Sequence, residues 1–435
     1  MRIHEKLGVA VPEVLLPAPG TDLQKWAVVA CDQYTAEPDY WRRVDELVGQ
    51  APSALRLIYP EAFLGEKDPE ARIAGIRRAM QAYLDRGLLV PYDGLVYVER
   101  QISTGTRRGV VLCLDLEQYD FRRGSQSLVR ATEATIVERI PPRVKIRRGA
   151  PLELPHIMVL VDDAEDRVLG PLAEAKRRLE PLYDFDLMMG AGRLCGWRVG
   201  DRRLEQAVMD GLAALAHPEA FACRYGLGEP RPVLLYAMGD GNHSLATAKA
   251  IWDETKQGPA RWALVELVSL HDPALVFEPI HRVLFGLSGG ADPVAALQQR
   301  HGARCRVRPV GAVAEMKAAI EARAPGRHRI GVVRPSGCAV VEVRDPDALL
   351  AVGTLQEVLD GFLEDAGTAR IDYVHGAAAV ESLGRHEGNA GFYLPAMDKR
   401  DLFKSVIWDG VLPRKTFSMG EAHEKRFYLE CRRLA

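Results

Sequence analysis

A strand, a tight turn and a helix follow one another in Val233-Leu-Leu-Tyr-Ala-Met-Gly-Asp-Gly-Asn-His-Ser-Leu-Ala-Thr-Ala-Lys249. The apolar run 233–238 is typical of a buried strand. Residues 239–242 predict a turn, because their two glycines adopt positive φ angles without steric cost. From His243 or Ser244 onward, apolar residues recur at helical spacing. We therefore expect a strand, a glycine-rich turn and a helix, with the rest of the chain organised around them.

This turn predicts an anion-binding site. The first amides of a helix have no partner inside the helix, and the helix dipole adds partial positive charge at that end. Asp240 and His243 place an acid and a base on the same turn, so both are predicted to be catalytic. The alternative is a structural turn in which Asp240 and His243 only cap the helix. The predicted anion ligands on this stretch are Gly239, Gly241, Asn242 and Ser244.

The composition is typical of a globular protein with two or three domains: 435 residues, 47% hydrophobic and 27% charged. A net charge of -2 gives no general attraction for nucleic acid or anionic membranes, so neither is an expected partner. Seven scattered cysteines without C-x-x-C spacing, and no apolar signal or membrane-length segment, predict a cytoplasmic protein. The expected partner is a small-molecule substrate, and the sequence leaves the oligomeric state open.

The order of elements predicts an α+β fold of mixed sheets with flanking helices. Two apolar strands at 95–100 and 109–115 are predicted to form a hairpin. The glycines after residue 286 indicate a linker, and the elements that follow indicate a smaller α+β module. We therefore predict a main body over 1–286, a module over 287–370, and a segment over 371–435 that returns to the main body.

Polar residues that could complete the site occur in two earlier segments. Asp32 follows an apolar strand predicted from Trp26 to Ala30, a position where α/β sites gather, although a turn-capping role is equally open. Residues 130–143 predict a polar loop, because small, acidic and arginine residues alternate there. Its guanidinium groups suit phosphate, and a solvated charged loop is the competing interpretation. The candidates in this loop are Thr132, Thr135 and Arg143 as ligands, with Glu133, like Asp32, as a catalytic base.

Two later segments supply further candidates. A strand predicted over residues 275–282 ends in His281 and Arg282, which is either a ligand pair or a structural histidine beside an arginine. The tail contains Leu412-Pro-Arg-Lys-Thr-Phe-Ser-Met-Gly420, in which Arg414 and Lys415 are predicted to bind phosphate or carboxylate. A basic turn that simply remains in water is the alternative there.

Several well-known motifs are missing from the sequence. There is no G-x-x-x-x-G-K-[ST] loop, no protein-kinase H-R-D or D-F-G set, no G-x-S-x-G elbow and no H-E-x-x-H. The acidic run 162–166 is more simply a charge cluster before a helix than a cation site. No metal site is therefore predicted from protein residues.

The segments quoted above resemble a bacterial family named domain of unknown function 1015. The resemblance rests on residues 240–249, on the strand ending at Arg282 and on residues 412–420. The segments Lys25-Trp-Ala-Val-Val-Ala-Cys-Asp-Gln-Tyr34 and Ala131-Thr-Glu-Ala-Thr135 also look like parts of that family. The resemblance covers nearly the whole chain and implies no function, because the family name records none.

The turn at Asp240 is also similar, more distantly, to the D-G-x-x-R turn of the ParB/sulfiredoxin-like superfamily. That superfamily includes nucleotide-binding proteins and kinases of free serine, in which the turn and the helix start hold nucleotide phosphates. The resemblance implies a ParB/sulfiredoxin-like core around this turn. Ser244 occupies the arginine position, so a phosphate-neutralising charge would have to come from elsewhere. The cations available for this are Lys249, Arg282, Arg143 and Arg414.

Three functions follow from these residues. The first is a nucleotide-dependent kinase of a small hydroxyl-bearing metabolite, with ATP or ADP and Mg²⁺ as the cofactor. The second is a phosphatase or hydrolase that uses the same anion site with Asp240 and His243 activating water. The third is a non-catalytic regulator that binds a nucleotide or nucleic acid, against which the near-neutral charge argues.

Overall fold

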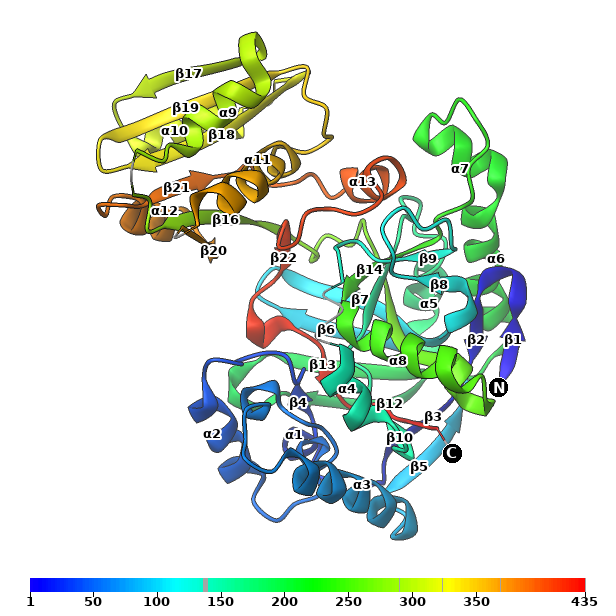
Figure 1. Ribbon diagram of the computed structural model, residues 1–435. Helices are drawn as coiled ribbons and strands as arrows, with labels where there is room; N and C mark the ends of the chain where they lie inside the picture. The colour runs from blue at the N-terminus through cyan, green and yellow to red at the C-terminus, as the bar shows by residue number, and fades with distance from the viewer. Residues whose placement is uncertain (136–139, 289, 323, 368, 435) are drawn as a thin grey trace. The chain divides into compact units, whose positions relative to one another are not determined.

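The computed structural model describes residues 1–135, 140–288, 290–322, 324–367 and 369–434. It divides into two units, each with its own sheet (Figure 1). Unit 1 comprises Met1–Val276 with Gly420–Ala435, and unit 2 comprises Phe277–Met419. Both units are α+β, as the sequence predicts. The boundaries differ from those expected at 286 and 370, because the strands on both sides of the small module pair inside the sheet of unit 2.

Unit 1 is built on an eleven-stranded mixed sheet. Most neighbours are antiparallel, whereas β11 pairs with β15, β14 with β9 and β8 with β9 in parallel. The main path, in spatial order, is β12 (Glu180–Asp186), β13 (Arg193–Val199), β6 (Leu95–Ile102), β7 (Gly105–Asp115), β15 (Trp262–Ser269), β11 (Met158–Val161), β14 (Tyr236–Asp240), β9 (Val129–Arg130) and β8 (Tyr119–Asp120). At the side of β7, β2 (Val9–Val11) and β1 (Arg2–His4) are added. The predicted hairpin is confirmed as β6 and β7.

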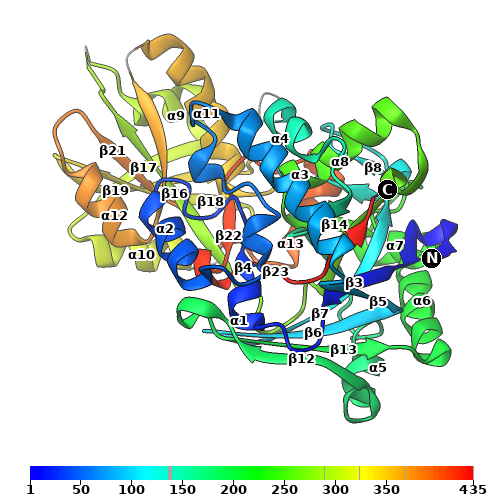
Figure 2. The same ribbon diagram turned by 90° about the horizontal axis from the view of Figure 1, so that it is seen from below.

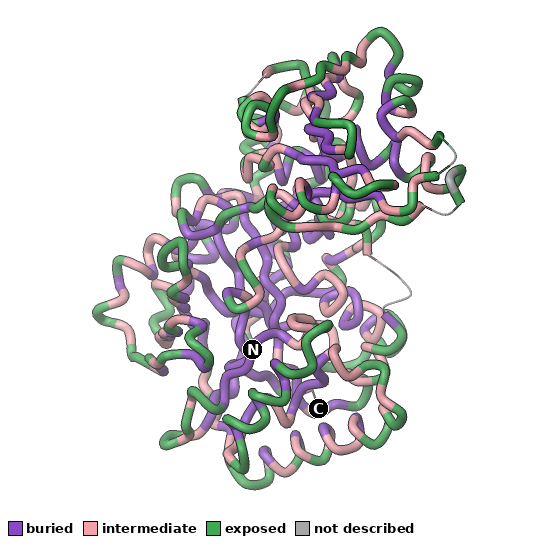
Figure 3. Tube along the Cα trace, turned by 90° about the vertical axis from the view of Figure 1, so that its left-hand side faces the viewer, coloured by how far each residue is buried: buried purple, intermediate pink, exposed green. Residues whose placement is uncertain are grey.

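Both faces of this sheet are buried. Successive residues of a strand point to opposite faces, so neighbouring residues enter different hydrophobic clusters. Val96 and Val98 belong to one hydrophobic cluster, and Leu95 and Tyr97 belong to the other. Figure 2 shows the helices on the two sides of the sheet, and Figure 3 shows buried residues concentrated in the interior. The first cluster contains side chains of α2 (Pro38–Val48) and α3 (Pro69–Asp85), and the second those of α5 (Gly170–Ala175), α6 (Arg202–Ala216) and α8 (Asn242–Thr255).

Shorter elements complete unit 1. The remaining helices are α1 (Leu23–Trp26), α4 (Ile140–Arg147) and α7 (Pro218–Tyr225). Three two-stranded sheets are formed by β3 (Glu13–Pro17) with β5 (Leu89–Asp93), β4 (Val28–Val29) with β23 (Phe427–Tyr428), and β10 (Leu152–Glu153) with β24 (Arg432–Arg433). Two of these three sheets use residues 420–434, so the last part of the chain returns to unit 1 as two of its strands.

Unit 2 contains an antiparallel sheet with helices on both faces. Its strands, in spatial order, are β17 (Cys305–Val310), β19 (Gly337–Arg344), β18 (Arg327–Arg334), β21 (Ala390–Tyr393), β16 (Phe277–Phe285) and β20 (Arg370–His375), with β22 (Phe417–Met419) also on β16. One face packs against α9 (Pro293–His301) and α11 (Ala351–Ala366), and the other against α10 (Val313–Glu321) and α12 (Ala377–Gly384). The last helix of the unit is α13 (Asp401–Asp409).

Three local predictions need correction. Trp26 ends the short helix α1, so the strand expected over residues 26–30 is reduced to Val28–Val29. The expected loop 130–143 contains the start of α4, since Pro141 and Pro142 fit a first helical turn that needs no amide donors. His281 and Arg282 do not end a strand, because β16 continues to Phe285 through its pairing with β20.

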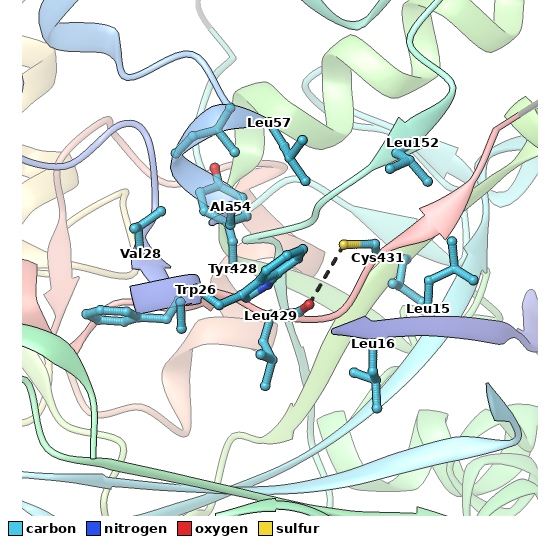
Figure 4. Packing of buried hydrophobic residues seen from close by; sticks show 14 of the residues in the cluster. Leu15, Leu16, Trp26, Val28, Ala54, Leu57, Leu152, Tyr428, Leu429 and Cys431 are labelled. Carbon is cyan, nitrogen blue, oxygen red and sulfur yellow. Dashed lines mark hydrogen bonds between the residues drawn. The ribbon is translucent and has the colours of Figure 1, made fainter. Parts of the chain in front are cut away.

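The C-terminal segment of residues 420–434 lies inside unit 1 rather than on its surface. Figure 4 shows Tyr428, Leu429 and Cys431 surrounded by side chains from the first half of the chain, including Trp26 and Leu57. Leu429 and Cys431 are completely buried. At roughly 25 cal/mol per Å² of apolar surface, burying such side chains stabilises the fold strongly, so this segment is part of the core.

A buried ion cluster fixes the same segment. The Arg426 guanidinium donates to Glu266 Oε2 at 2.9 Å and to Glu430 Oε2 at 2.7 Å, and it also donates to the backbone carbonyl of Pro155. Tyr183 donates its hydroxyl proton to the other oxygen of Glu430. All three charged side chains are at most 5% exposed. Because Glu266 lies on the central strand β15, one arginine connects the C-terminal segment to the middle of the sheet.

We expect Arg426→Met to lower the free energy of unfolding of unit 1 by about 3–5 kcal/mol, because the buried carboxylates of Glu266 and Glu430 would both lose the guanidinium that lies between them. Urea unfolding followed by tryptophan fluorescence reports mainly on unit 1, which contains five of the six tryptophans. Arg433→Met is the matched control, since Arg433 lies on β24 of the same C-terminal segment and is exposed. Equal losses in the two variants would contradict a special role for the cluster.

Candidate functional site

The predicted strand, turn and helix are present as β14, Gly241 and α8. Gly241 has φ 78° and forms the N-cap, and a Cβ there would lie 3.0 Å from Ile157 Cα. Both the backbone angle and the lack of space therefore require glycine. Its carbonyl accepts the first helical hydrogen bond from Leu245 N–H at 3.0 Å. Among the described residues no side chain caps this helix, so its first turn offers backbone N–H groups to an anion.

His156 is the centre of a polar cluster beside this helix start. Its Nε2 lies 3.1 Å from Ser244 Oγ and 3.6 Å from Asp32 Oδ2, and its Nδ1 lies 2.7 Å from the Tyr428 hydroxyl. The ring is 6% exposed. The cluster thus joins the loop after β4, the residue pair before β11, the first turn of α8 and strand β23.

These contacts assign the hydrogen positions on His156. The carboxylate of Asp32 faces Nε2, so that nitrogen is favoured as the one that carries a hydrogen. When the ring is protonated, Nδ1 donates to the Tyr428 hydroxyl oxygen, which also accepts from the backbone N–H of Cys31 at 3.2 Å. With Nε2 as a donor, the Ser244 hydroxyl keeps its own hydrogen for another acceptor. His156 is therefore a donor toward the site and not a base for Ser244.

The charges of His156 and Asp32 stabilise one another. Burial alone would lower the pKa of His156, but the adjacent Asp32 carboxylate outweighs it and the pKa is raised. Burial alone would raise the pKa of Asp32, whereas His156, a hydrogen bond from Gln33 and the charge of Lys425 together lower it. Asp32 is consequently held as a carboxylate at the end of the cluster.

Asp240 forms the other acidic side of the site. Its Oδ1 accepts the backbone N–H of Gly241 at 2.9 Å, and its Oδ2 lies 3.3 Å from Lys425 Nζ. The Lys425 side chain is only 12% exposed, so this ion pair is more strongly coupled than one on the surface. Lys425 thereby supplies a cation close to the start of α8.

The other residues predicted on these segments have different environments. Thr132 is buried and donates its hydroxyl proton to the Met238 carbonyl at 2.8 Å, which ties residues 131–135 to β14. Thr135 Oγ1 and Asn242 Oδ1 are buried atoms without a hydrogen-bond partner among the described residues. Gly239 lies inside β14, and the His243 carbonyl accepts from Thr247 at 2.7 Å. Glu133 lies partly exposed after β9.

Arg143 belongs to a cavity next to the His156 cluster. It lies on α4 and forms an ion pair with Glu61, so its guanidinium is not part of an open polar loop. Burial raises the pKa of Glu61, although Arg143 opposes the shift. The cavity has a volume of about 130 Å³. Its lining includes Ser244, His156 and Tyr428, the Glu61–Arg143 ion pair and mainly aliphatic side chains.

Four predicted residues lie in unit 2 and are described there. Arg282 is completely buried, and its guanidinium donates to Gln356 Oε1 at 3.2 Å and to the carbonyls of Ile280, Arg414 and Lys415. His281 Nδ1 accepts from the Leu394 amide at 3.1 Å, and burial together with Arg282 lowers the pKa of His281 to about 4. Arg414 donates to the Tyr373 hydroxyl at 2.9 Å. Lys415 has φ 58° in the turn before β22. Arg282 thus organises this turn through its backbone carbonyls.

Sequence reasoning missed three residues of the cluster in unit 1: His156, Lys425 and Tyr428. His156 stands beside Pro155 before a strand, a position that gives no functional signal by itself. Lys425 lies in the basic run 423–426, which the sequence marks only as a polar tail. One signal could have found them. Several charged residues stand within an otherwise apolar C-terminal stretch, and charged residues in such a stretch are rarely buried unless they are paired.

Two further features are absent from the described part of the chain. It contains no group of three or more histidine, cysteine, aspartate or glutamate side chains arranged to hold a metal ion. Within the same residues, no helix combines the length and the apolar character needed to cross a membrane.

The sequence matches a family model described as "Protein of unknown function (DUF1015)" over residues 15–362. The chain belongs to the DUF1015 family. No curated protein matches this DUF1015 chain. Among solved structures, it is similar to a free serine kinase in complex with AMP, at 11% identity and a TM-score of 0.39, covering 73% of this chain and 90% of that one.

Another related structure is SbnI from Staphylococcus aureus with a C-terminal truncation. The DUF1015 chain and SbnI share 10% sequence identity with a TM-score of 0.36, and the match covers 71% of this chain and 82% of SbnI. A free serine kinase in complex with ADP gives 9% identity and a TM-score of 0.40, over 73% of this chain and 91% of that one. These are distant similarities.

The stability of unit 1 should depend on pH through the Asp32–His156 pair. The raised pKa of His156 stabilises the fold below its ordinary value of 6.5, and this contribution is lost as the pH rises through the raised value. The lowered pKa of Asp32 stabilises the fold above its ordinary value of 3.8, and this contribution is lost as the pH falls toward the lowered value. We therefore expect Asp32→Asn to destabilise unit 1 more at pH 5 than at pH 9.

Urea unfolding at both pH values measures the loss of stability in Asp32→Asn. An NMR titration of His156 measures the coupling itself, and the pKa of His156 should be lower in the variant than in the wild type. Asp253→Asn is the control, because Asp253 pairs with Lys249 and Lys256 at the far end of α8 and does not titrate between these pH values. An unchanged His156 pKa in Asp32→Asn would refute the coupling.

Proposed function

We propose that this protein is a nucleotide-dependent phosphotransferase that acts on the hydroxyl group of a small molecule. One observation carries the proposal: the uncapped start of α8 is surrounded by two cationic side chains and two carboxylates. Phosphoryl transfer requires positioning of phosphates, neutralising charge and a base for the incoming hydroxyl, and little covalent chemistry from the protein. All three requirements are met within this cluster.

Each residue has a role in this proposal. The backbone N–H groups at the start of α8 and the Ser244 hydroxyl bind phosphate oxygens, while His156 and Lys425 neutralise their charge. Asp32 accepts the proton of the substrate hydroxyl, because it is held ionised beside His156. The hydroxyl oxygen bonds to the terminal phosphorus as the bond from that phosphorus to the leaving nucleoside diphosphate breaks.

Magnesium is the metal that such chemistry uses, and the oxygen ligands near the turn suit it. Mg²⁺ is commonly held by one or two carboxylates together with substrate phosphates, so a complete protein cage is not needed. Asp240 would hold it together with Asn242 Oδ1, which has no hydrogen-bond partner among the described residues, and the ion would add positive charge at the phosphates. Displacement of Lys425 from Asp240 would free that lysine for the nucleotide.

The order of β14, the glycine turn and α8 supports assigning this part of unit 1 to the ParB/sulfiredoxin-like type. Ser244 in place of arginine is explained within the proposal, since Lys425 provides the missing cation from the C-terminal segment. Seven free cysteines and the use of ATP suit a cytoplasmic location.

Binding of a nucleotide tests the proposal directly. We expect millimolar ADP or ATP with Mg²⁺ to raise the melting temperature, because a ligand that binds only the folded state stabilises it. Lys425→Met should weaken this binding about tenfold or more, as expected for loss of a charge-assisted contact. Isothermal titration calorimetry gives the affinities.

Lys249→Met is the matched control. Lys249 lies on α8, the helix whose start forms the proposed site, but its ammonium group pairs with Asp253 at 3.0 Å. The control should bind nucleotide like the wild type. If no nucleotide shifts the melting temperature, or if phosphate is released from simple phosphate esters without any nucleotide, the phosphotransferase proposal fails and a hydrolase takes its place.

A further inference from the structure

The cavity beside His156 is lined by two kinds of side chain. Most are apolar, among them Leu57, Ile58, Leu64, Met80, Ile146 and Leu152. Ser244, His156 and Tyr428, which are joined by hydrogen bonds, form a polar group in the same lining. A ligand that fills this cavity therefore places an apolar part against the aliphatic side chains and a polar group beside the proposed phosphate site.

The charged groups that line the cavity are already neutralised by protein partners. Glu61 pairs with Arg143, and Arg147 pairs with Glu153, which also binds Arg432. His156 faces Asp32. A charged ligand would have to break one of these buried pairs, which costs several kcal/mol when a charge is left uncompensated. The described lining residues thus favour a ligand that is neutral in the part entering the cavity.

The volume limits the size of that part. An apolar protein cavity of roughly 150 Å³ is known to take up benzene. At about 130 Å³, this cavity has room for a group of about the same size, on the order of six carbon atoms. A free amino acid such as serine would bring two charges that the cavity does not need.

We infer that this cavity binds the phosphoryl acceptor, and that the acceptor is a neutral alcohol with an apolar group of about six carbons. The hydroxyl lies beside His156 and Ser244, and its proton passes to Asp32, which faces the same nitrogen of His156. This inference rests on the proposed function for the role of the alcohol as acceptor. The binding of such an alcohol to the cavity does not depend on any nucleotide.

A series of straight-chain alcohols from ethanol to octanol tests the inference on the full chain, with binding measured by saturation-transfer NMR. Each added methylene should strengthen binding about fourfold up to about six carbons, because each buried methylene removes apolar surface from water. Binding should level off beyond that length. Benzyl alcohol should bind comparably to hexanol, and L-serine should not bind at the same concentrations.

Two variants connect the binding to this cavity. Leu64 is 36% exposed, so Leu64→Trp can fill the mouth of the cavity with little risk to the fold, and it should weaken hexanol binding at least tenfold. Met80→Ala should move the plateau toward longer alcohols by enlarging the cavity. Leu47→Trp is the control, because Leu47 is 49% exposed and does not line the cavity.

The outcomes separate the two proposals. No chain-length dependence, tighter binding of serine than hexanol, or hexanol binding that survives in Leu64→Trp would overturn the inference, while nucleotide binding could still stand. Displacement of hexanol by adenosine would also overturn it, since the cavity would then hold the nucleoside. If hexanol binds as expected but ADP with Mg²⁺ does not, the cavity assignment holds and the phosphotransferase proposal fails.

Discussion

One buried guanidinium, that of Arg426, holds unit 1 together and shapes its site. It lies between Glu266 on the central strand and Glu430 on the C-terminal segment, and it also binds the Pro155 carbonyl. Pro155 immediately precedes His156, and Arg426 immediately follows Lys425. The same arginine therefore fixes the backbone next to two of the site's cations. A buried ion pair adds little net stability compared with apolar packing, but it specifies one arrangement of the groups around it.

The strongest periodic patterns were the easiest to predict. The α+β class, the hairpin of β6 and β7 and strand β15 all follow from apolar runs and turn residues, because both faces of the sheet of unit 1 are buried. Local patterns did not define the unit boundaries. Strands β20 and β21 look like a return to the main body, yet they pair with β16, and the choice of partner depends on contacts distant in sequence.

In the candidate site, too, local patterns predicted some residues, whereas others depend on contacts distant in sequence. Asp240, Gly241 and Ser244 could be grouped as candidates from the sequence because a single turn contains them all, and Asp32 because it follows a short strand. His156, Lys425 and Tyr428 come from segments up to 397 positions away from the contacts they make, as in the hydrogen bond from Cys31 to Tyr428. No local pattern links such residues. Conversely, Arg282 suggested a ligand, although the carbonyls of its own unit occupy its guanidinium.

The return of residues 420–434 to unit 1 has a consequence for synthesis of the protein. Unit 2 lies between the two parts of unit 1 in the sequence, so all of it leaves the ribosome before Lys425, Arg426 and Tyr428 do. Until then Glu266 lacks its hydrogen-bonded partner Arg426, and unit 1 lacks the strands β23 and β24. Domains tend to fold in the order in which they emerge. The nascent chain therefore acquires this candidate site only after all of unit 2 has been synthesised, and a product truncated before residue 420 lacks it.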